Sequence, residues 1–371
     1  MTSLVIPVAV LAEARRVADA FCQRTGVAVD AAELLCGRAG LLGLSPQGRI
    51  SAGGATRLMR SGDGWCALTL SRQDDLDAIP ALLESDAVGD DPWPAVQRWV
   101  AANSSADVTA RARLLGLPVA ALGETPDAPP RITTLGAAAA LREPSGLLVA
   151  DLSSMWAGPL CGQLLARAGA TVVKVETPGR PDGTRAGPST FFDWMNSGKL
   201  SYAVNFDERS RLRRLLEAAD VVIESSRPAA LARRSLGPTD TGQRDGRVWL
   251  RITGHGAEGE QADWVAFGDD AAVSGGLVGG TAREPVFCGD AIADPLTGLH
   301  AALSGVESLS RGGGELVELS MAAVAATYAA GDRAAETHCT ATPKPSAPTS
   351  ELGSDNAAVE RLLAERRLAA C

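Results

Sequence analysis

The sequence predicts an α/β protein with a doubly wound, mostly parallel, Rossmann-like sheet and a second, smaller α+β domain. From residue 146 onward, short apolar runs alternate with helical patterns, which is the order expected of βαβ units. Before residue 125 the pattern differs, because amphipathic helices flank a single hairpin. We therefore divide the chain into a small-domain-like region at 1–125, a linker at 126–145, a large domain at 146–336, and an extended arm with a C-terminal helix at 337–371.

The first region contains two helical patterns and one strand pair. Residues 11–22 and 93–102 repeat apolar side chains at helical spacing, so each predicts an amphipathic helix. Residues 56–70 read as a hairpin, since two apolar runs enclose the turn Ser61-Gly62-Asp63-Gly64. Four prolines within residues 126–145 then predict an extended linker.

Five apolar runs in the large domain predict strands, and the segments between them include helices at 160–168 and 209–219. The predicted strands are residues 146–152, 170–176, 200–206, 220–224 and 248–253. In an open α/β sheet the ligand lies beyond the carboxyl ends of the strands. We therefore expect the binding site among the segments that follow them, at 151–158, 176–185, 225–228 and 254–259.

Composition narrows the choice of partners. The net charge of −9, with no basic stripe, argues against a nucleic acid or an anionic membrane surface. The seven cysteines are scattered, with no CxxC pair and no histidine at metal spacing, so we expect reduced thiols and no metal site. With no signal sequence and no 18-residue apolar span, the chain is predicted to be cytoplasmic. Arginine far outnumbers lysine, which suggests a GC-rich bacterial genome.

Asp294-Pro295 precedes leucines at helical spacing, so the simplest interpretation makes Asp294 the N-cap of a helix with Pro295 in its first turn. The segment after the first strand of the large domain, Ser153–Pro159, does not have the glycine spacing of a dinucleotide-binding or phosphate-binding loop. A nicotinamide enzyme is therefore not expected.

Several short motifs follow one another in a fixed order between residues 146 and 323. They are Val149–Ser153, Ala157-Gly158-Pro159, Val172–Pro178, Asn196–Lys199, Ala219–Glu224, Ile252-Thr253-Gly254, Ile292–Gly298 and Leu316–Ser320. Together they resemble the family III CoA-transferases, which include formyl-CoA and carnitine CoA-transferases and, as a relative, α-methylacyl-CoA racemase.

The resemblance implies that Asp294 is the catalytic nucleophile of a CoA-transferase. A carboxylate is ionised at neutral pH and needs no base before it attacks a thioester. The implied path runs through an aspartyl anhydride and an enzyme thioester, with CoA as substrate and product and no tightly bound cofactor. The implied partners are an acyl-CoA, a carboxylic acid and a second copy of the chain in a homodimer.

The resemblance also implies CoA contacts at Met155, Trp156 and Ala157, around the Ala-Gly-Pro motif. Two positions depart from the family pattern: Thr177 replaces a frequent basic residue, and Ser225-Ser226 replaces Asn-Phe. Other cations are then needed for the phosphate groups, and the candidates are Lys199, Arg180, Arg185 and Arg227.

Two alternatives remain open. Racemases of this family carry Gly-His-Asp where this chain has Gly268-Asp269-Asp270, which favours transfer, although His255 could serve instead. The third hypothesis is a catalytically silent subunit that binds acyl-CoA. It stays open because the order of the domains is unusual and a family fold does not by itself guarantee activity. Family chains begin at the Asp-Leu-Ser strand, whereas here a region that resembles the family's small domain, with Gly53-Gly54 and Asp63-Gly64-Trp65, comes first.

Overall fold

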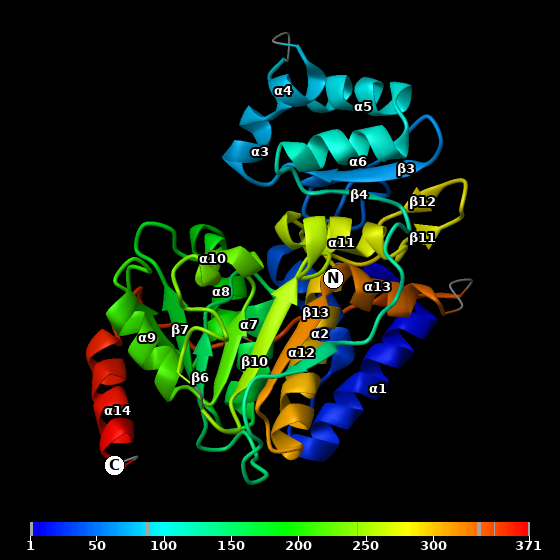
Figure 1. Ribbon diagram of the computed structural model, residues 1–371. Coiled ribbons are helices and arrows are strands. Elements are labelled where there is room, and N and C mark those ends of the chain that lie inside the picture. Colours follow the sequence, from blue (N-terminus) through cyan, green and yellow to red (C-terminus); the bar gives the residue numbers. More distant parts are fainter. Residues whose placement is uncertain (1–2, 86–88, 243, 332–334, 345, 370–371) are drawn as a thin grey trace.

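A seven-stranded sheet forms the centre of the protein, as the computed structural model shows for residues 3–85, 89–242, 244–331, 335–344 and 346–369 (Figure 1). Its strand order is β5-β13-β10-β9-β6-β7-β8, and every neighbouring pair is parallel except β13 with the edge strand β5. The predicted doubly wound, mostly parallel α/β fold is thus confirmed. The strands are β5 (Arg131–Thr134), β6 (Leu148–Asp151), β7 (Thr171–Glu176), β8 (Leu200–Ala203), β9 (Val221–Glu224), β10 (Val248–Thr253) and β13 (Glu315–Ser320).

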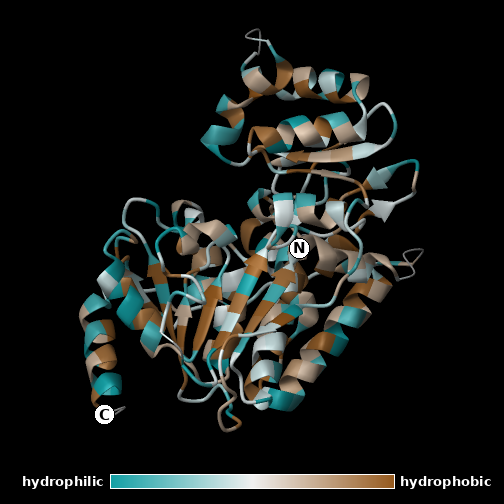
Figure 2. Cartoon of the chain, in the orientation of Figure 1, coloured by the Kyte–Doolittle hydropathy of each residue, from teal (hydrophilic) through white to brown (hydrophobic). Residues whose placement is uncertain are grey.

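Helices cover both faces of this sheet because successive apolar residues of each strand point to opposite sides. Val149, for example, belongs to one core and its neighbour Leu148 to the other. These apolar strands stand out in Figure 2. The first face is covered by α1 (Val8–Thr25), α2 (Ala31–Leu42), α7 (Ala157–Arg167), α8 (Ser189–Asn196) and α12 (Ala293–Ser310), and the second by α9 (Arg209–Ala218), α10 (Pro228–Ala232) and α14 (Asn356–Ala369).

The first 44 residues pack with the large sheet, which differs from the boundary predicted at residue 125. Strand β1 (Leu4–Pro7) pairs with β14 (Glu336–Cys339), and α1 packs against α12 and α13 (Met321–Ala329). Helix α2 approaches α8 closely, because a Cβ at Gly37 would lie 2.6 Å from the Trp194 ring. The N-terminal segment is therefore part of the main core, a long-range pairing that local patterns do not reveal.

The smaller unit has a three-stranded antiparallel sheet of β2 (Thr56–Arg60), β3 (Trp65–Thr69) and β4 (Val119–Ala121). The predicted hairpin is confirmed. Three helices cover one face, namely α4 (Ile79–Leu83), α5 (Trp93–Ala102) and α6 (Ser105–Leu114), and the short α3 (Gln73–Asp77) precedes α4 and contacts it. The other face meets α11 (Gly268–Ser274) of the large unit, where Leu58 and Trp65 share a cluster with Val273 (Figure 1).

The linker and the arm carry more structure than predicted. Residues 131–134 of the linker form the edge strand β5, whose side chains are all exposed, so no apolar pattern marked it. Two short 3-10 helices, at Gly183–Ala186 and Gly259–Asp263, and the strand pair β11 (Gly279–Gly280) and β12 (Pro285–Val286) complete the described elements. In the part of the chain that the structure describes, no helix is both long and apolar enough to cross a membrane.

Gly298 allows α12 to pack closely against α7 beside the Ile292–Gly298 motif. A Cβ there would lie 2.6 Å from the carbonyl oxygen of Ala157 in α7. We expect Gly298→Ala to lower the free energy of unfolding by about 1–3 kcal/mol, although alanine is favoured over glycine within a helix by about 1 kcal/mol. Urea denaturation measures the change.

Gly305 of the same helix provides the matched control. Its added Cβ would meet the end of the Leu250 side chain at 3.1 Å, which can shift, so Gly305→Ala should cost much less. Equal losses in the two variants would show that the α7–α12 contact is not unusually tight.

Candidate active site

Asp294 lies in the first turn of α12, and its predicted role as the N-cap is wrong. The helix begins two residues earlier than expected, with Ile292 as the N-cap in helical conformation, and the Asp294 N–H bonds to the carbonyl oxygen of Ala291 at 2.9 Å. Ala291 has a φ of 42°, so the chain turns sharply before the helix. Since the side chain of Asp294 does not cap its own helix, its carboxylate is available to other groups.

Three helices begin around this carboxylate. Ala157 is the first residue of α7 and Gly268 the first of α11, and hydrogen bonding from both backbone N–H groups lowers the pKa of Asp294. Only glycine fits at position 268, because a Cβ there would lie 2.4 Å from the Asp294 Oδ2 atom. Exposed N–H groups in the first turn of a helix favour a negative charge nearby. These two N–H groups therefore favour the ionised form of Asp294.

Burial acts in the opposite direction and outweighs these hydrogen bonds. Loss of solvent raises the pKa of Asp294 to about 7, although Arg38 and the two N–H groups lower it. Its neighbour Asp269 raises the pKa further and is itself shifted to about 6, mainly by burial. A carboxyl with a pKa near 7 is poised between its acid and its nucleophilic form at neutral pH.

Arg38 of α2 is the site residue that sequence analysis missed. Its Nη1 atom lies 2.7 Å from the Asp290 Oδ1 atom, and its guanidinium carbon lies 5.6 Å from the ring centres of both Trp156 and Phe191. It is one of many arginines, in a helix far from the motifs in sequence. The close approach of α2 at Gly37 brings it here, and no local pattern signals that contact.

The two carboxyls of the Gly268-Asp269-Asp270 segment connect the two units. Asp269 accepts from the Ala291 N–H at 3.0 Å and from the Thr56 hydroxyl at 3.4 Å. Asp270 accepts from the Phe267 N–H at 3.1 Å and from the Thr69 hydroxyl at 2.7 Å, and burial raises its pKa to about 7. Both side chains therefore bind α11 and the turn before α12 to the hairpin of the smaller unit.

His255, the alternative racemase base, packs elsewhere in the described contacts. Its ring lies edge-on to Trp264, with 5.4 Å between ring centres, and its Nδ1 atom is 3.4 Å from the Ser274 hydroxyl. Burial lowers its pKa to about 4, so it is neutral at pH 7. The structure therefore does not place His255 against Asp294.

The three residues predicted to contact CoA at the Ala-Gly-Pro motif have different surroundings. Met155 is exposed at 39%, has a φ of 75°, and its N–H points to the Asp182 carboxylate at 3.1 Å. Trp156 is buried beneath Arg38, and its indole N–H has no acceptor among the described residues. Ala157 is buried and begins α7, with its N–H toward Asp294. The motif thus connects the exposed Met155 side chain with the buried Asp294 carboxylate.

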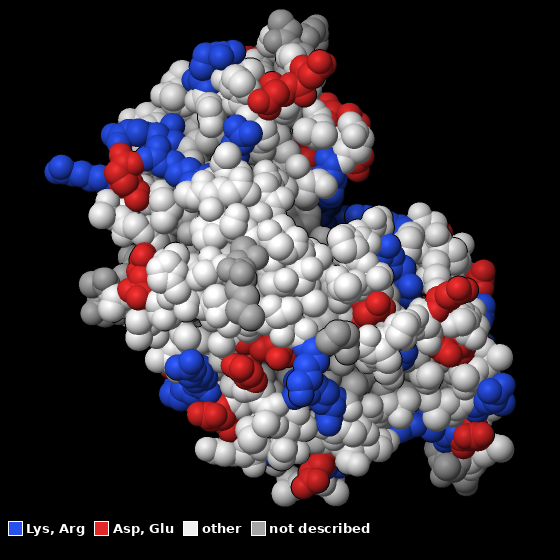
Figure 3. Space-filling view, turned by 180° about the vertical axis from the view of Figure 1, so that it is seen from behind, with Lys and Arg blue, Asp and Glu red and all other residues white. Residues whose placement is uncertain are grey.

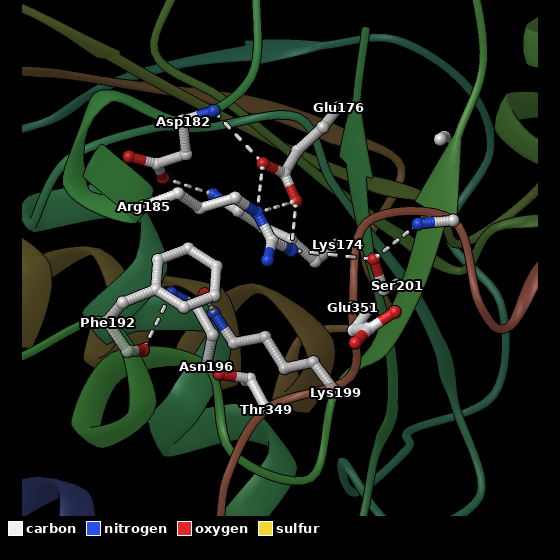
Figure 4. A network of polar contacts seen from close by, with 12 residues as sticks. Lys174, Glu176, Asp182, Arg185, Phe192, Asn196, Lys199, Ser201, Thr349 and Glu351 are labelled. Carbon is white, nitrogen blue, oxygen red and sulfur yellow. Dashed lines mark hydrogen bonds and ion pairs between the residues drawn. The ribbon is translucent and has the colours of Figure 1, made fainter. Parts of the chain in front are cut away.

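Lys199 does not fit the predicted phosphate contact. Its ammonium group is buried and donates to Asp151 at 2.9 Å, to the Pro159 carbonyl oxygen at 2.8 Å and to Asn196 at 3.0 Å, which uses its three N–H bonds. Figure 4 shows Lys199 beside Asn196. Lys199 therefore has a structural role, in which it ties the end of β6 to α7 and α8.

Arg185 is also engaged, whereas Arg180 and Arg227 remain exposed. The Arg185 Nε and Nη2 atoms bond to Glu176 at 2.8 and 2.7 Å, and its guanidinium lies 4.1 Å from the Phe192 ring centre (Figure 4). Arg180 and Arg227 lie in the loops after β7 and β9, at the carboxyl edge of the sheet. Both side chains are exposed at the edge where the phosphate contacts are predicted, and that role stays a prediction.

Comparison with known proteins identifies the family of this chain. A model of CoA-transferase family III matches residues 145–359. The chain belongs to CoA-transferase family III. The match covers the strands and helices that carry Ala157, Gly268 and Asp294, and leaves Arg38 outside.

Two curated relatives are CoA-transferases that match this chain over about half of their length. The chain is 31% identical to the succinyl-CoA–D-citramalate CoA-transferase of Chloroflexus aurantiacus, over 46% of this chain and 47% of that protein. It is 33% identical to the succinate–glutarate CoA-transferase of Agrobacterium fabrum, over 42% and 44%. A solved CaiB/BaiF family protein from Brucella suis is 29% identical, with a TM-score of 0.45 over 50% of this chain and 55% of that one. The chain thus spans about half the length of the curated relatives it matches.

The raised pKa of Asp294 predicts a pH-dependent stability. A carboxyl with a higher pKa in the folded than in the unfolded chain keeps its proton longer when folded, so stability falls as pH rises from about 4 to about 7. Asp294→Asn removes this loss. We expect the variant to gain stability relative to the parent protein between pH 5 and pH 8, by on the order of a few kcal/mol.

Urea titrations of both proteins at the two pH values test this. If the free energy of unfolding changed by the same amount in both proteins between pH 5 and pH 8, the pKa of Asp294 would not be raised by folding. Asp240→Asn, at an exposed turn, is the control and should leave the pH dependence unchanged.

Proposed function

We propose that this protein transfers CoA between an acyl-CoA and a carboxylic acid, with Asp294 as the nucleophile. The observation that carries the proposal is the position of this one carboxylate, in the family motif, where α7, α11 and α12 begin. A carboxyl with a pKa near 7 supplies the ionised form at neutral pH and is more basic than a solvated one.

The steps balance without ATP. The Asp294 carboxylate attacks the thioester carbonyl, the C–S bond breaks, and CoA leaves as the thiolate, which gives a mixed anhydride. The thiolate then attacks the Asp294 carbonyl, which releases the first carboxylate and leaves CoA on Asp294 as a thioester. The acceptor carboxylate attacks this thioester, and the released thiolate takes the new acyl group from the second anhydride. Asp294 is thereby restored.

The N–H groups of Ala157 and Gly268 have a second role in this scheme. When the Asp294 carbonyl is attacked, negative charge develops on the oxygen that these groups already face. Preformed donors at that position stabilise the transition state without reorganisation. Met155 and Trp156, with Arg180 and Arg227 nearby on the same sheet edge, are proposed as the CoA contacts.

The setting of the enzyme is also a proposal. We propose a homodimer in the bacterial cytoplasm, with a small carboxylic acid and an acyl-CoA as its substrates. The family motifs support the homodimer and the substrates, and the scattered cysteines support a reducing compartment. Seen from behind, the molecule has a broad face with few charged side chains and a hollow between its two units that contains basic ones (Figure 3). An uncharged face is suited to contact a second copy.

Removal of the nucleophile tests the mechanism. Asp294→Asn should keep the fold, as circular dichroism measures, but lose at least 1,000-fold in transfer rate, on the order seen when a nucleophile is removed. Incubation with a panel of acyl-CoAs, followed by intact mass measurement, should show covalent attachment to the parent protein and to Asp240→Asn but none to Asp294→Asn. Attachment to Asp294→Asn at the parental level would remove Asp294 from the mechanism.

The fate of the α proton separates transfer from racemisation. The Gly268-Asp269-Asp270 segment lacks the histidine of the racemases, and both of its carboxyls accept hydrogen bonds from the smaller unit, which supports transfer. In deuterated buffer, 2-methylacyl-CoA should gain no deuterium at its α carbon on the time scale of turnover, as mass spectrometry would measure. Exchange as fast as turnover would favour the racemase.

A further inference from the structure

Arg38 has binding capacity that its protein contacts do not use. Among the described residues, its guanidinium has one hydrogen-bonding partner, the Asp290 carboxylate at 2.7 Å. The side chain is 24% exposed, whereas that of Asp290 is fully buried. A guanidinium has five N–H donors in a rigid plane, so several remain available to a ligand.

The charges around Arg38 indicate what that ligand is. Arg38 lowers the pKa of three carboxyls, those of Asp269, Asp290 and Asp294, so it is the cation that acts on the nucleophile. An acid substrate must bring a second negative charge close to this group. Repulsion between two carboxylates in a partly buried site is strong unless a cation lies between or beside them. Arg38 is placed to supply that charge.

Aromatic rings fix the orientation of the guanidinium. Trp156 and Phe191 meet edge to face, with 5.4 Å between ring centres, and both lie 5.6 Å from the Arg38 guanidinium carbon. Gly53 leaves room on another side, because a Cβ there would lie 3.3 Å from the Nη2 atom. Since Trp156 directly precedes Ala157, whose N–H faces Asp294, the same segment sets the positions of cation and nucleophile.

We propose that Arg38 binds the carboxylate group of the acid substrate and holds it beside Asp294. The inference rests on the proposed function for its chemistry. It assigns acceptor recognition to α2, in the N-terminal part of the chain and outside the segment that the family model matches. Asp290 orients the guanidinium through its hydrogen bond with Nη1. Lysine cannot fully replace arginine, because its ammonium group lacks the planar, paired N–H donors that match a carboxylate.

Binding is measured first without turnover, in the Asp294→Asn protein. Saturation-transfer NMR compares the affinity for acetate, succinate and benzoate with the affinity for the neutral amide of each acid. We expect at least one acid to bind more tightly than its amide. This preference for the acid should fall tenfold or more in Arg38→Gln and by a smaller factor in Arg38→Lys. Arg49→Lys is the matched control, because Arg49 also lies over a tryptophan, 4.6 Å from the ring centre of Trp65, and should change nothing.

Kinetics of the otherwise unaltered enzyme give a second, independent readout. Arg38→Lys should raise the KM for the acid at least fivefold while the KM for acyl-CoA stays within twofold. An Arg38→Gln protein that is folded and prefers acid over amide like its parent would overturn the proposal, as would a parent that binds none of the acids better than its amide. If acid binding depends on Arg38 but no transfer occurs, the proposed function fails and the binding role stands.

Discussion

The arrangement of the site depends on one buried carboxylate that three helix starts surround. Asp294 loses solvent at the junction of α7, α11 and α12, and two backbone N–H groups with Arg38 compensate only in part. Much of the nearby packing serves this junction. Gly268 and Gly298 carry no side chain because a Cβ would collide with the carboxylate or with α7. The pKa of about 7 follows from the balance between burial and these partners.

The two units are joined at the same place. Asp269 and Asp270, at the start of α11, accept hydrogen bonds from Thr56 and Thr69 of the smaller unit. On the other side, α2 brings Arg38 from the first 44 residues into contact with Asp290. The segments before residue 145 therefore complete a site whose central carboxylate, Asp294, lies in the matched family segment. This arrangement suits the proposed mechanism, in which an anhydride intermediate must be kept from water.

Local sequence patterns predicted the strands of the large sheet and the hairpin of the smaller unit. The alternation of apolar runs gave the parallel sheet, and the Gly-rich turn at residues 61–64 gave the hairpin, because both follow from side-chain periodicity and turn chemistry. The family motif predicted the position of Asp294 as nucleophile, which remains a proposal. The strand β5 was missed because its four side chains are exposed.

Long-range contacts account for the other differences. Lys199 looked like a phosphate ligand because lysine is rare, yet it pairs with Asp151, which lies 48 residues earlier in the chain. Arg38 carries no sequence signal, since its role depends on the contact of α2 with the aromatic pair Trp156 and Phe191. The N-cap interpretation failed because the sharp turn at Ala291 starts α12 one residue before Asp294. Such contacts are decided by tertiary packing.

Direct titration of the Asp294 carboxyl tests the central claim. The protein is labelled with ¹³C at aspartate side-chain carboxyls, and the Asp294 resonance is assigned by its absence in Asp294→Asn. The account predicts a midpoint near pH 7 for this carboxyl. A midpoint near 4, the value of a solvated aspartate, would show that burial does not raise the pKa of Asp294 and would contradict the account.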